Sequence, residues 1–168
     1  GQHRARAVIC GNMASPTADP SWGPAGSYAS GADGTLIRCA VRQAAHEGWQ
    51  VSALDVKSAF LQAPRPTAPG AAPVAVVPPK IMSQLGICPE NEVWIVHKAL
   101  YGFQTSPSFW ALHRDAMFNK FDWIAEGVKY KLQPTKERNL WRVLQEGCDA
   151  PVGLMLVYVD DLMVMRSE

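Results

Sequence analysis

Two adjacent carboxylates stand between two short apolar runs near the end of the sequence. Residues 152–165 read VGLMLVYVDDLMVM, with Asp160 and Asp161 at the centre. Runs of this length, rich in Val, Leu and Met, are typical of strands that are buried on both faces. An Asp-Asp pair suits the two-residue bend of a hairpin, because Asp tolerates turn dihedrals and bonds to its own backbone. The pattern predicts a hairpin bending at Asp160 and Asp161, and spacing alone favours a purely structural turn.

A third carboxylate follows another segment with the pattern of a strand. Residues 51–60 read VSALDVKSAF, in which Asp55 ends an alternating run and small residues lead to Phe60. Neighbouring carboxylates repel each other, and a divalent cation removes that repulsion. Mg²⁺ usually binds one or two protein carboxylates together with substrate phosphates. Asp55 and Asp160 on neighbouring strands, with Asp161 close by, would satisfy this requirement, although the spacing does not prove that they meet.

The composition limits the class of protein. A chain of 168 residues with 48% hydrophobic residues is about one globular domain with a real core. A net charge of +1 does not indicate a basic nucleic-acid binder, but acids clustered at a metal site would cancel bases elsewhere. No apolar run is long enough to span a membrane, so we expect no membrane partner. The sequence has four scattered cysteines, Cys10, Cys39, Cys88 and Cys148, and they form no CxxC pair. This argues against a zinc site or a disulfide framework and for a reducing compartment.

The segments around these acids predict alternating helices and strands. A helix should begin at Thr35 as its cap and end at Gly48, packing behind the strand that carries Asp55. Short strands are expected at residues 74–77, 91–96 and 139–145, and Pro/Gly/Ala-rich loops at about 13–34 and 62–73. Strands interleaved with helices that cover one sheet face indicate an α+β fold.

A second helix is predicted to open at Ser106 and Pro107, with Ser106 as the cap. Apolar residues then recur at helical spacing, and we expect them to pack in the core: Phe109, Leu112, His113, Ala116, Met117 and Phe121.

Three segments together resemble a known family. Residues 158–161, YVDD, match the YxDD box of reverse transcriptases. Residues 54–60, LDVKSAF, are similar to the first catalytic box in the form used by copia-type LTR retrotransposons. Residues 98–107, KALYGFQTSP, resemble the KALYGLKQAPR segment of the copia branch. Three boxes in the right order, at plausible separations, make a specific signal that runs from about residue 4 to residue 168.

The resemblance implies an RNA-directed DNA polymerase. Its fold would be a palm with an antiparallel sheet backed by helices, plus partial fingers, in one incomplete domain over residues 1–168. The reaction would be two-metal nucleotidyl transfer from a dNTP to a primer 3′-hydroxyl. The catalytic carboxylates would be Asp55, Asp160 and Asp161, with the Val56 carbonyl as a further metal ligand. The cofactor would be two Mg²⁺ ions, with Mn²⁺ as a substitute.

The family also implies six residues that bind the nucleotide: Arg6, Ser58, Ala59, Phe60, Tyr101 and Gly102. The Arg6 guanidinium would meet the triphosphate, because its planar fork suits phosphate oxygens. Phe60 would act as a sugar gate, since a flat ring under C2′ leaves no room for a ribose hydroxyl. The amides of Ser58 and Ala59 would bind phosphate oxygens, and Tyr101 would lie under the nascent base pair.

The implied partners are an RNA or DNA template-primer, dNTPs, and the rest of a retrotransposon polyprotein with its thumb and RNase H. The implied location is a cytoplasmic virus-like particle with a nuclear phase. Because the sequence opens on Gly1 and ends just after the hairpin, we expect a piece of a longer chain. Few bases are clustered for phosphate contacts, so residues 1–168 alone should bind duplex weakly and polymerise little or nothing.

Two other classes stay open. One is a degenerate, catalytically inactive retroelement remnant, which would fold without Mg²⁺-dependent activity. The other is a different palm-type nucleotidyl transferase, such as a nucleotidyl cyclase, which would need neither template nor primer.

Overall fold

The computed structural model describes residues 8–10, 31–65 and 73–167, in two compact units. The first unit comprises Gly1–Tyr28 and Phe60–Trp110, and the second comprises Ala29–Ala59 and Ala111–Glu168. Arg6 lies outside the described residues, as do most of the loops expected at residues 13–34 and 62–73.

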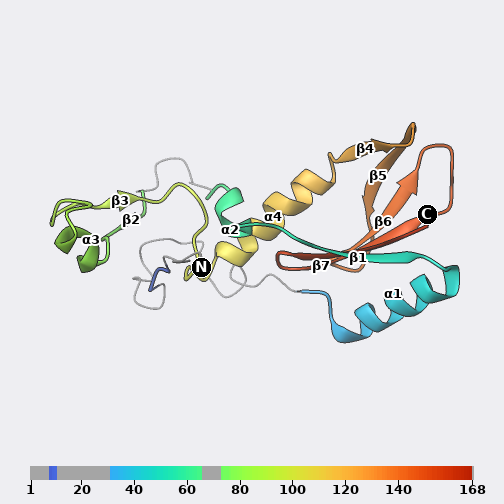
Figure 1. Cartoon of the computed structure of the whole chain (residues 1–168), viewed down its shortest axis with the longest axis horizontal. Helices are drawn as coiled ribbons and strands as arrows, with labels where there is room; N and C mark the ends of the chain where they lie inside the picture. The colour runs from blue at the N-terminus through green and yellow to red at the C-terminus, as the bar shows by residue number, and fades with distance from the viewer. Residues whose placement is uncertain (1–7, 11–30, 66–72, 168) are drawn as a thin grey trace. The chain divides into compact units, whose positions relative to one another are not determined.

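Within the described residues, the second unit is built on a six-stranded antiparallel sheet in the order β1-β8-β7-β6-β5-β4 (Figure 1). The strands from β4 to β8 pair in sequence order, and β1 pairs with β8 at the edge. The sheet curls, and with its helices it gives the predicted α+β class. The strands are β1 (Gln50–Asp55), β4 (Asp122–Ala125), β5 (Val128–Pro134), β6 (Leu140–Gln145), β7 (Gly153–Tyr158) and β8 (Asp161–Arg166).

The first predicted helix is present as α1 (Gly34–Glu47), and it ends at Gly48 in the left-handed conformation. Its cap is Asp33, so the assignment of Thr35 as the cap was wrong. The Asp33 carboxylate accepts the N–H groups of Leu36 at 2.9 Å and Thr35 at 2.7 Å. Those two backbone hydrogen bonds, the one from Leu36 being the larger effect, lower the pKa of Asp33 below its ordinary value. An ionised Asp33 therefore satisfies two N–H groups that the first turn leaves unpaired.

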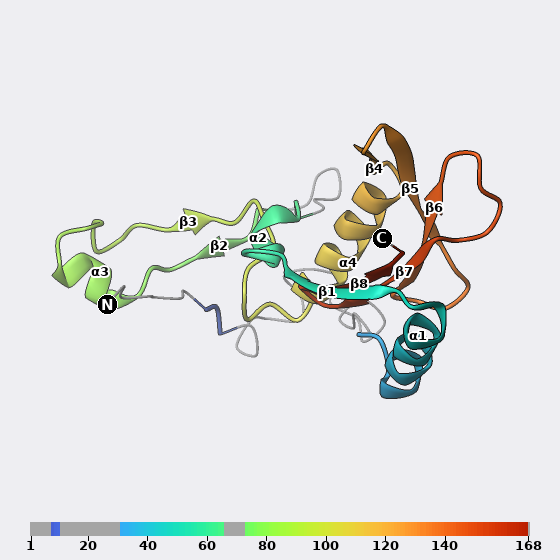
Figure 2. The same cartoon turned by 45° about the vertical axis from the view of Figure 1, so that its right-hand side comes forward.

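One face of the sheet packs against α1 (Figure 2). Ala40 and Ala44 on the helix are buried together with Leu156 on β7 and Met165 on β8. The helix contacts β7 and β8, whereas we had expected it behind β1. The reason lies in β1, whose six residues are all exposed at the sheet edge, so the apolar stripe of α1 finds its partners further in.

The opposite sheet face buries a second apolar cluster, made of Leu132, Trp141, Val143, Met155 and Val157. Phe118, at the end of α4 (Ser106–Phe118), packs against this cluster with its ring edge-on to Trp141 at 5.3 Å. Helices therefore contribute to both sheet faces, and the expectation that they cover one face was wrong. Residues of β7 and β8 alternate between the two clusters, so both faces of these strands pack against apolar side chains.

The apolar stripe predicted for the second helix is buried at its start, where Phe109 is 9% exposed, but not further along. Leu112, Met117 and Phe121 are 66%, 55% and 51% exposed. The side chain buried from this part of the helix is Arg114, at 4% exposure. A charged residue can occupy such a position because its N–H groups find partners, and here they do: Asp115 and Asn139 accept them.

The first unit contains α3 (Lys80–Gln84), part of α2 (Ala59–Gln62), and a short antiparallel pair of β2 (Ala75–Val76) with β3 (Trp94–Ile95). The two strands were predicted, although they are shorter than expected. Ser106 does not cap α4, because its hydroxyl donates to the Leu100 carbonyl at 2.6 Å and accepts the Leu100 N–H at 3.1 Å. In the part of the chain that is described, no helix is long and apolar enough to cross a lipid bilayer.

Candidate metal and nucleotide site

The predicted hairpin is formed by β7 and β8, but it bends one residue earlier than expected. Tyr158 pairs with Asp161, so the two bend residues are Val159 and Asp160. Val159 has a φ of 57°, a left-handed conformation that is rare for a β-branched residue. Such a conformation costs about 1–3 kcal/mol and persists only where the surroundings enforce it. The outcome is that Asp160 lies in the bend and Asp161 opens β8.

The register of β1 against β8 sets Asp55 directly opposite Asp161. Beyond the strand end, the Val56 N–H donates to the Asp160 carbonyl at 2.9 Å, which ties β1 to the hairpin bend. Directly opposite residues on antiparallel strands have Cβ atoms about 4.5–5.5 Å apart, and like charges there are destabilising. The chain thus places two negative charges where they repel, an arrangement that a bound cation would relieve.

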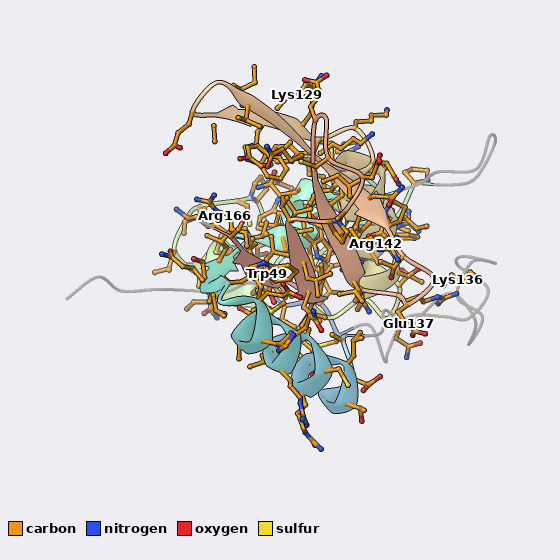
Figure 3. The ribbon with its side chains drawn as sticks, turned by 90° about the vertical axis from the view of Figure 1, so that its right-hand side faces the viewer. Trp49, Lys129, Lys136, Glu137, Arg142 and Arg166 are labelled. Atoms are coloured by element: carbon orange, nitrogen blue, oxygen red, sulfur yellow. The ribbon has the colours of Figure 1, made fainter. Side chains whose placement is uncertain are left out.

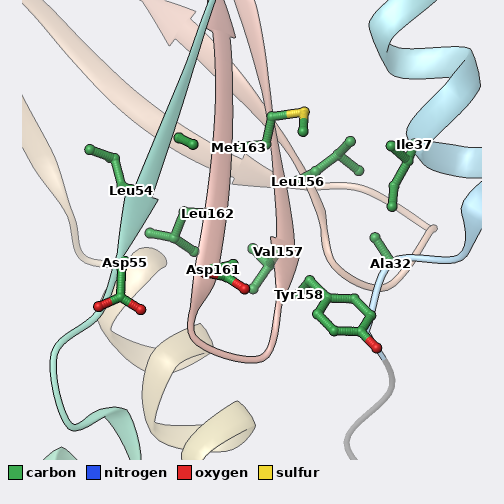
Figure 4. A pocket seen from close by; sticks show the side chains of 11 residues that line it. Ala32, Ile37, Leu54, Asp55, Leu156, Val157, Tyr158, Asp161, Leu162 and Met163 are labelled. Atoms are coloured by element: carbon green, nitrogen blue, oxygen red, sulfur yellow. The ribbon is translucent and has the colours of Figure 1, made fainter.

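A cavity of about 280 Å³ in the second unit includes both of these acids in its wall. Figure 4 shows the Asp55 and Asp161 carboxyl groups at the same end of neighbouring strands, with the Tyr158 ring on the far side of β7. The remaining wall is apolar: Ala32, Ile37, Ala53, Leu54, Leu156, Val157, Leu162 and Met163. The cavity therefore has an acidic end beside an apolar lining.

The oxygen donors at this end of the sheet fit a hard divalent cation. Mg²⁺ takes one or two carboxylates and completes its shell with water and substrate phosphates. Asp55 and Asp161 are exposed, and Asp160 is half-buried in the bend beside them. Within the described ranges, no three His, Cys, Asp or Glu side chains are grouped closely enough to hold a metal ion by themselves. A cation held here by Asp55 and Asp161 would need further oxygen donors, such as water, to complete its shell.

Sequence reasoning missed the segment that flanks the hairpin on the side of α1. The Ala32 N–H donates to the Val157 carbonyl at 3.1 Å. A Cβ on Gly31 would collide with the ring of Tyr158, so only glycine lets that ring lie where it does. Two small residues before a helix carry no recognisable signal of this role. Their contacts hold β7 at Val157 and Tyr158, the last two residues before the bend.

The predicted nucleotide-binding residues are divided between the units. In the second unit, Ser58 is exposed with a φ of 54°, and Ala59 is buried at the start of α2. In the first unit, the Phe60 ring lies 4.9 Å from the Tyr101 ring at an interplanar angle of 47°. These two rings therefore form one aromatic contact inside the first unit.

Gly102 lies against the short described segment near the N-terminus. It has a φ of 97°, and a Cβ there would collide with the backbone of Ile9. The Ile9 N–H donates to the Tyr101 carbonyl at 2.8 Å. A glycine is required at this position for two independent reasons, the left-handed backbone and the close approach.

Comparisons with protein-family models, with curated proteins and with solved structures found no match to this chain.

Proposed function

We propose that this chain is the fingers-palm part of a copia-type reverse transcriptase. In this reaction the primer 3′-oxygen forms a bond to the α-phosphorus of a dNTP. The bond from that phosphorus to the bridging oxygen breaks, pyrophosphate leaves, and the hydroxyl proton passes to solvent. The partners are an RNA or DNA template-primer and the remainder of a retrotransposon polyprotein, in a virus-like particle.

The observation that supports the proposal is the strand register at the acidic end of the sheet. It sets Asp55 opposite Asp161, and the Val56 N–H holds the bend that carries Asp160. A two-residue hairpin bend takes a positive φ at its first position, so the left-handed Val159 follows from the turn itself. A turn with a structural purpose alone would not need two opposed carboxylates at a cavity wall. The three acids come from segments more than 100 positions apart in the sequence, as the YVDD and LDVKSAF boxes require.

Each acid has its own part in holding the cation. Asp55 and Asp161 would hold it as an opposed pair, and Asp160 and the Val56 carbonyl would be its further ligands. When bound, Mg²⁺ supplies positive charge that activates the primer 3′-hydroxyl and stabilises the leaving pyrophosphate. The hydrogen bond from the Val56 N–H to the Asp160 carbonyl ties the end of β1 to the bend.

We propose that the aromatic contact in the first unit selects dNTPs over rNTPs. The Phe60 ring, supported by Tyr101, excludes a 2′-hydroxyl by its volume. Ser58 and Ala59 offer backbone amides to phosphate oxygens, and Arg6 offers a guanidinium.

The test is single-nucleotide addition to an annealed DNA primer on an RNA template, with protein in excess to offset weak duplex binding. We expect Mg²⁺-dependent addition of one dNMP that is lost in Asp160→Asn. The matched control is Asp149→Asn, since Asp149 is exposed in the turn between β6 and β7. Addition that Asp160→Asn leaves intact would contradict the catalytic assignment. Absence of any addition would favour the inactive remnant, and turnover of nucleotides without template or primer would favour a cyclase.

A further inference from the structure

Arg114 is a buried charge that the proposed reaction does not use. Only 4% of it is exposed. Its Nε donates to Asp115 at 2.9 Å, and a terminal nitrogen forms an ion pair with the same carboxylate at 2.7 Å. Another hydrogen bond, of 3.1 Å, runs from its terminal NH2 group to the Asn139 side-chain oxygen. Burying a guanidinium is costly, so these partners must hold it in one place.

Asn139 is the buried end residue of the turn between β5 and β6. Its φ of 66° is left-handed, which Asn tolerates better than most residues. Thr135 closes the same turn, with its hydroxyl within 3.0 Å of the carbonyls of Glu137 and Leu140. Figure 3 shows Lys136 and Glu137 on the outside of the unit, whereas Asn139 is inside it. The turn is therefore built to present Asn139 to the interior.

The carbonyl of Asn139 reaches the hairpin that carries the acids. It accepts the Val157 N–H at 2.9 Å, and the Val157 carbonyl in turn accepts the Ala32 N–H. Val157 directly precedes Tyr158, which pairs with Asp161. A continuous path thus leads from the buried guanidinium, through the side chain and the carbonyl of Asn139, to Val157, two residues before the hairpin bend.

We propose that Arg114 and Asn139 are positioning residues for the acidic site, which deepens the proposed function and rests on it. Arg114 locks the Asn139 side chain, and this fixes the direction of the Asn139 carbonyl. The carbonyl holds β7 at Val157 and so sets where the Val159–Asp160 bend and Asp161 stand relative to Asp55. The role of the buried Arg114 charge is therefore to place the acids.

The experiment measures the affinity for Mn²⁺ together with the thermal stability of each variant. The specific signal is the Mn²⁺ binding that Asp55→Asn removes. Arg114→Met keeps the side-chain volume, and it leaves a carboxylate on Asp115 that water can reach, since that side chain is 44% exposed. Asn139→Gly keeps the left-handed backbone and removes the side chain. We expect both to weaken Mn²⁺ binding by about tenfold, the low end of the range for residues that orient metal ligands.

Two further variants separate positioning from a loss of stability. Asn139→Asp keeps the acceptor and a tolerated left-handed residue, so it should restore the affinity of the unsubstituted chain. Val143→Ala removes buried volume on β6, beside Gly153 at the other end of β7, and should lower stability without changing Mn²⁺ affinity.

The outcomes distinguish the two proposals. The positioning role would be overturned if Arg114→Met and Asn139→Gly left the Mn²⁺ affinity unchanged. It would also be overturned if Val143→Ala lowered the affinity as much as they do. In both cases the proposed function would stand. A chain that folds but shows no Mn²⁺ binding dependent on Asp55 would overturn the proposed function and the positioning role together.

Discussion

The two ends of the β7–β8 hairpin are built in opposite ways. At its open end, Gly153 and Met165 lie so close together that a Cβ on Gly153 would collide with the Met165 carbonyl, and the Met165 side chain is fully buried. At the bend, the side chains are charged or at least partly exposed, and backbone hydrogen bonds hold the chain: the N–H groups of Val56 and Ala32 donate to it, and the Asn139 carbonyl accepts from it. Apolar packing thus stabilises the open end, whereas hydrogen bonds place charges at the bend at some cost in strain. Changes at the two ends should therefore have separable effects.

The largest effect is expected for the acids at the bend. Asp160→Asn should reduce Mg²⁺-dependent nucleotide addition by about 100-fold or more, the size seen when a group stabilising transition-state charge is lost. Its effect on folding should be small, because removing one of several neighbouring negative charges also removes repulsion. Single-turnover rates and chemical unfolding of the same preparations test this. A fall in stability that matches the fall in rate would break the distinction between the two ends.

A substitution at the open end should have the opposite effects, lowering stability and leaving Mn²⁺ affinity unchanged. Met165→Ala should lower the free energy of unfolding by about 3 kcal/mol, since it leaves a cavity in the cluster beneath α1. Mn²⁺ affinity, measured well below the melting temperature, should stay within about twofold of the unsubstituted chain because no hydrogen bond at the bend is touched. Loss of Mn²⁺ binding in this variant while it remains folded would show that the two ends are coupled.

The comparison extends to the first unit through Phe60. Phe60→Val should lower the selectivity for dNTPs over rNTPs by about tenfold or more, because a smaller side chain no longer fills the space of a ribose 2′-hydroxyl. The matched control is Phe121→Val, since Phe121 is an exposed ring on the second unit. The measurement is the rate of dNTP addition relative to rNTP addition on one template. Equal selectivity in Phe60→Val and Phe121→Val would show that Phe60 has a packing role alone.

The smallest effect concerns Asp33, next to the Ala32 contact with β7. Its pKa is lowered by the N–H groups of Leu36 and Thr35, so the ionised cap stabilises the fold fully above the ordinary value of 3.8. That stability is lost as the pH falls through the lowered folded-state pKa. Below pH 3.8 we expect lower protection of the Thr35 and Leu36 amides, measured as hydrogen exchange relative to the intrinsic rate at each pH. Asp33→Asn keeps a cap that does not titrate, so its exchange should be less sensitive to acid, and equal sensitivity would contradict the capping role.

The sequence predicts those parts of the fold that depend on local apolar pattern. The helix ending at Gly48, the hairpin and the strand ending at Asp55 all follow from periodicity and from one glycine. Periodicity misled for α4, where Leu112 and Met117 are exposed and Arg114 is buried. One partner of Arg114, Asn139, lies in a turn 25 residues away that has no sequence signal. The sequence does not predict strands β4 and β5, because they lack an apolar run. Their charged and aromatic residues alternate, and Asp122 on β4 forms an exposed ion pair with Lys129 on β5.

The candidate site was predictable as a set of residues but not as a geometry. Acidic residues at the ends of apolar runs pointed to Asp55, Asp160 and Asp161, with Asp55 expected beside Asp160. The register instead sets Asp55 opposite Asp161, because Val159, rather than the second aspartate, enters the bend with Asp160. A shift of one residue in a strand moves each side chain to the other face, so the pairing could not be read from spacing.

The most direct test of the acidic site is the location of a bound paramagnetic ion. Mn²⁺ added to isotopically labelled protein should broaden the amide signals of Val56, Asp161 and Leu162 first, and Asp55→Asn should abolish this at the same Mn²⁺ concentration. Asp149→Asn should leave the broadening as it is in the unsubstituted chain. Broadening that begins elsewhere, or that persists at Val56 without the Asp55 carboxylate, would contradict a cation site between β1 and the hairpin.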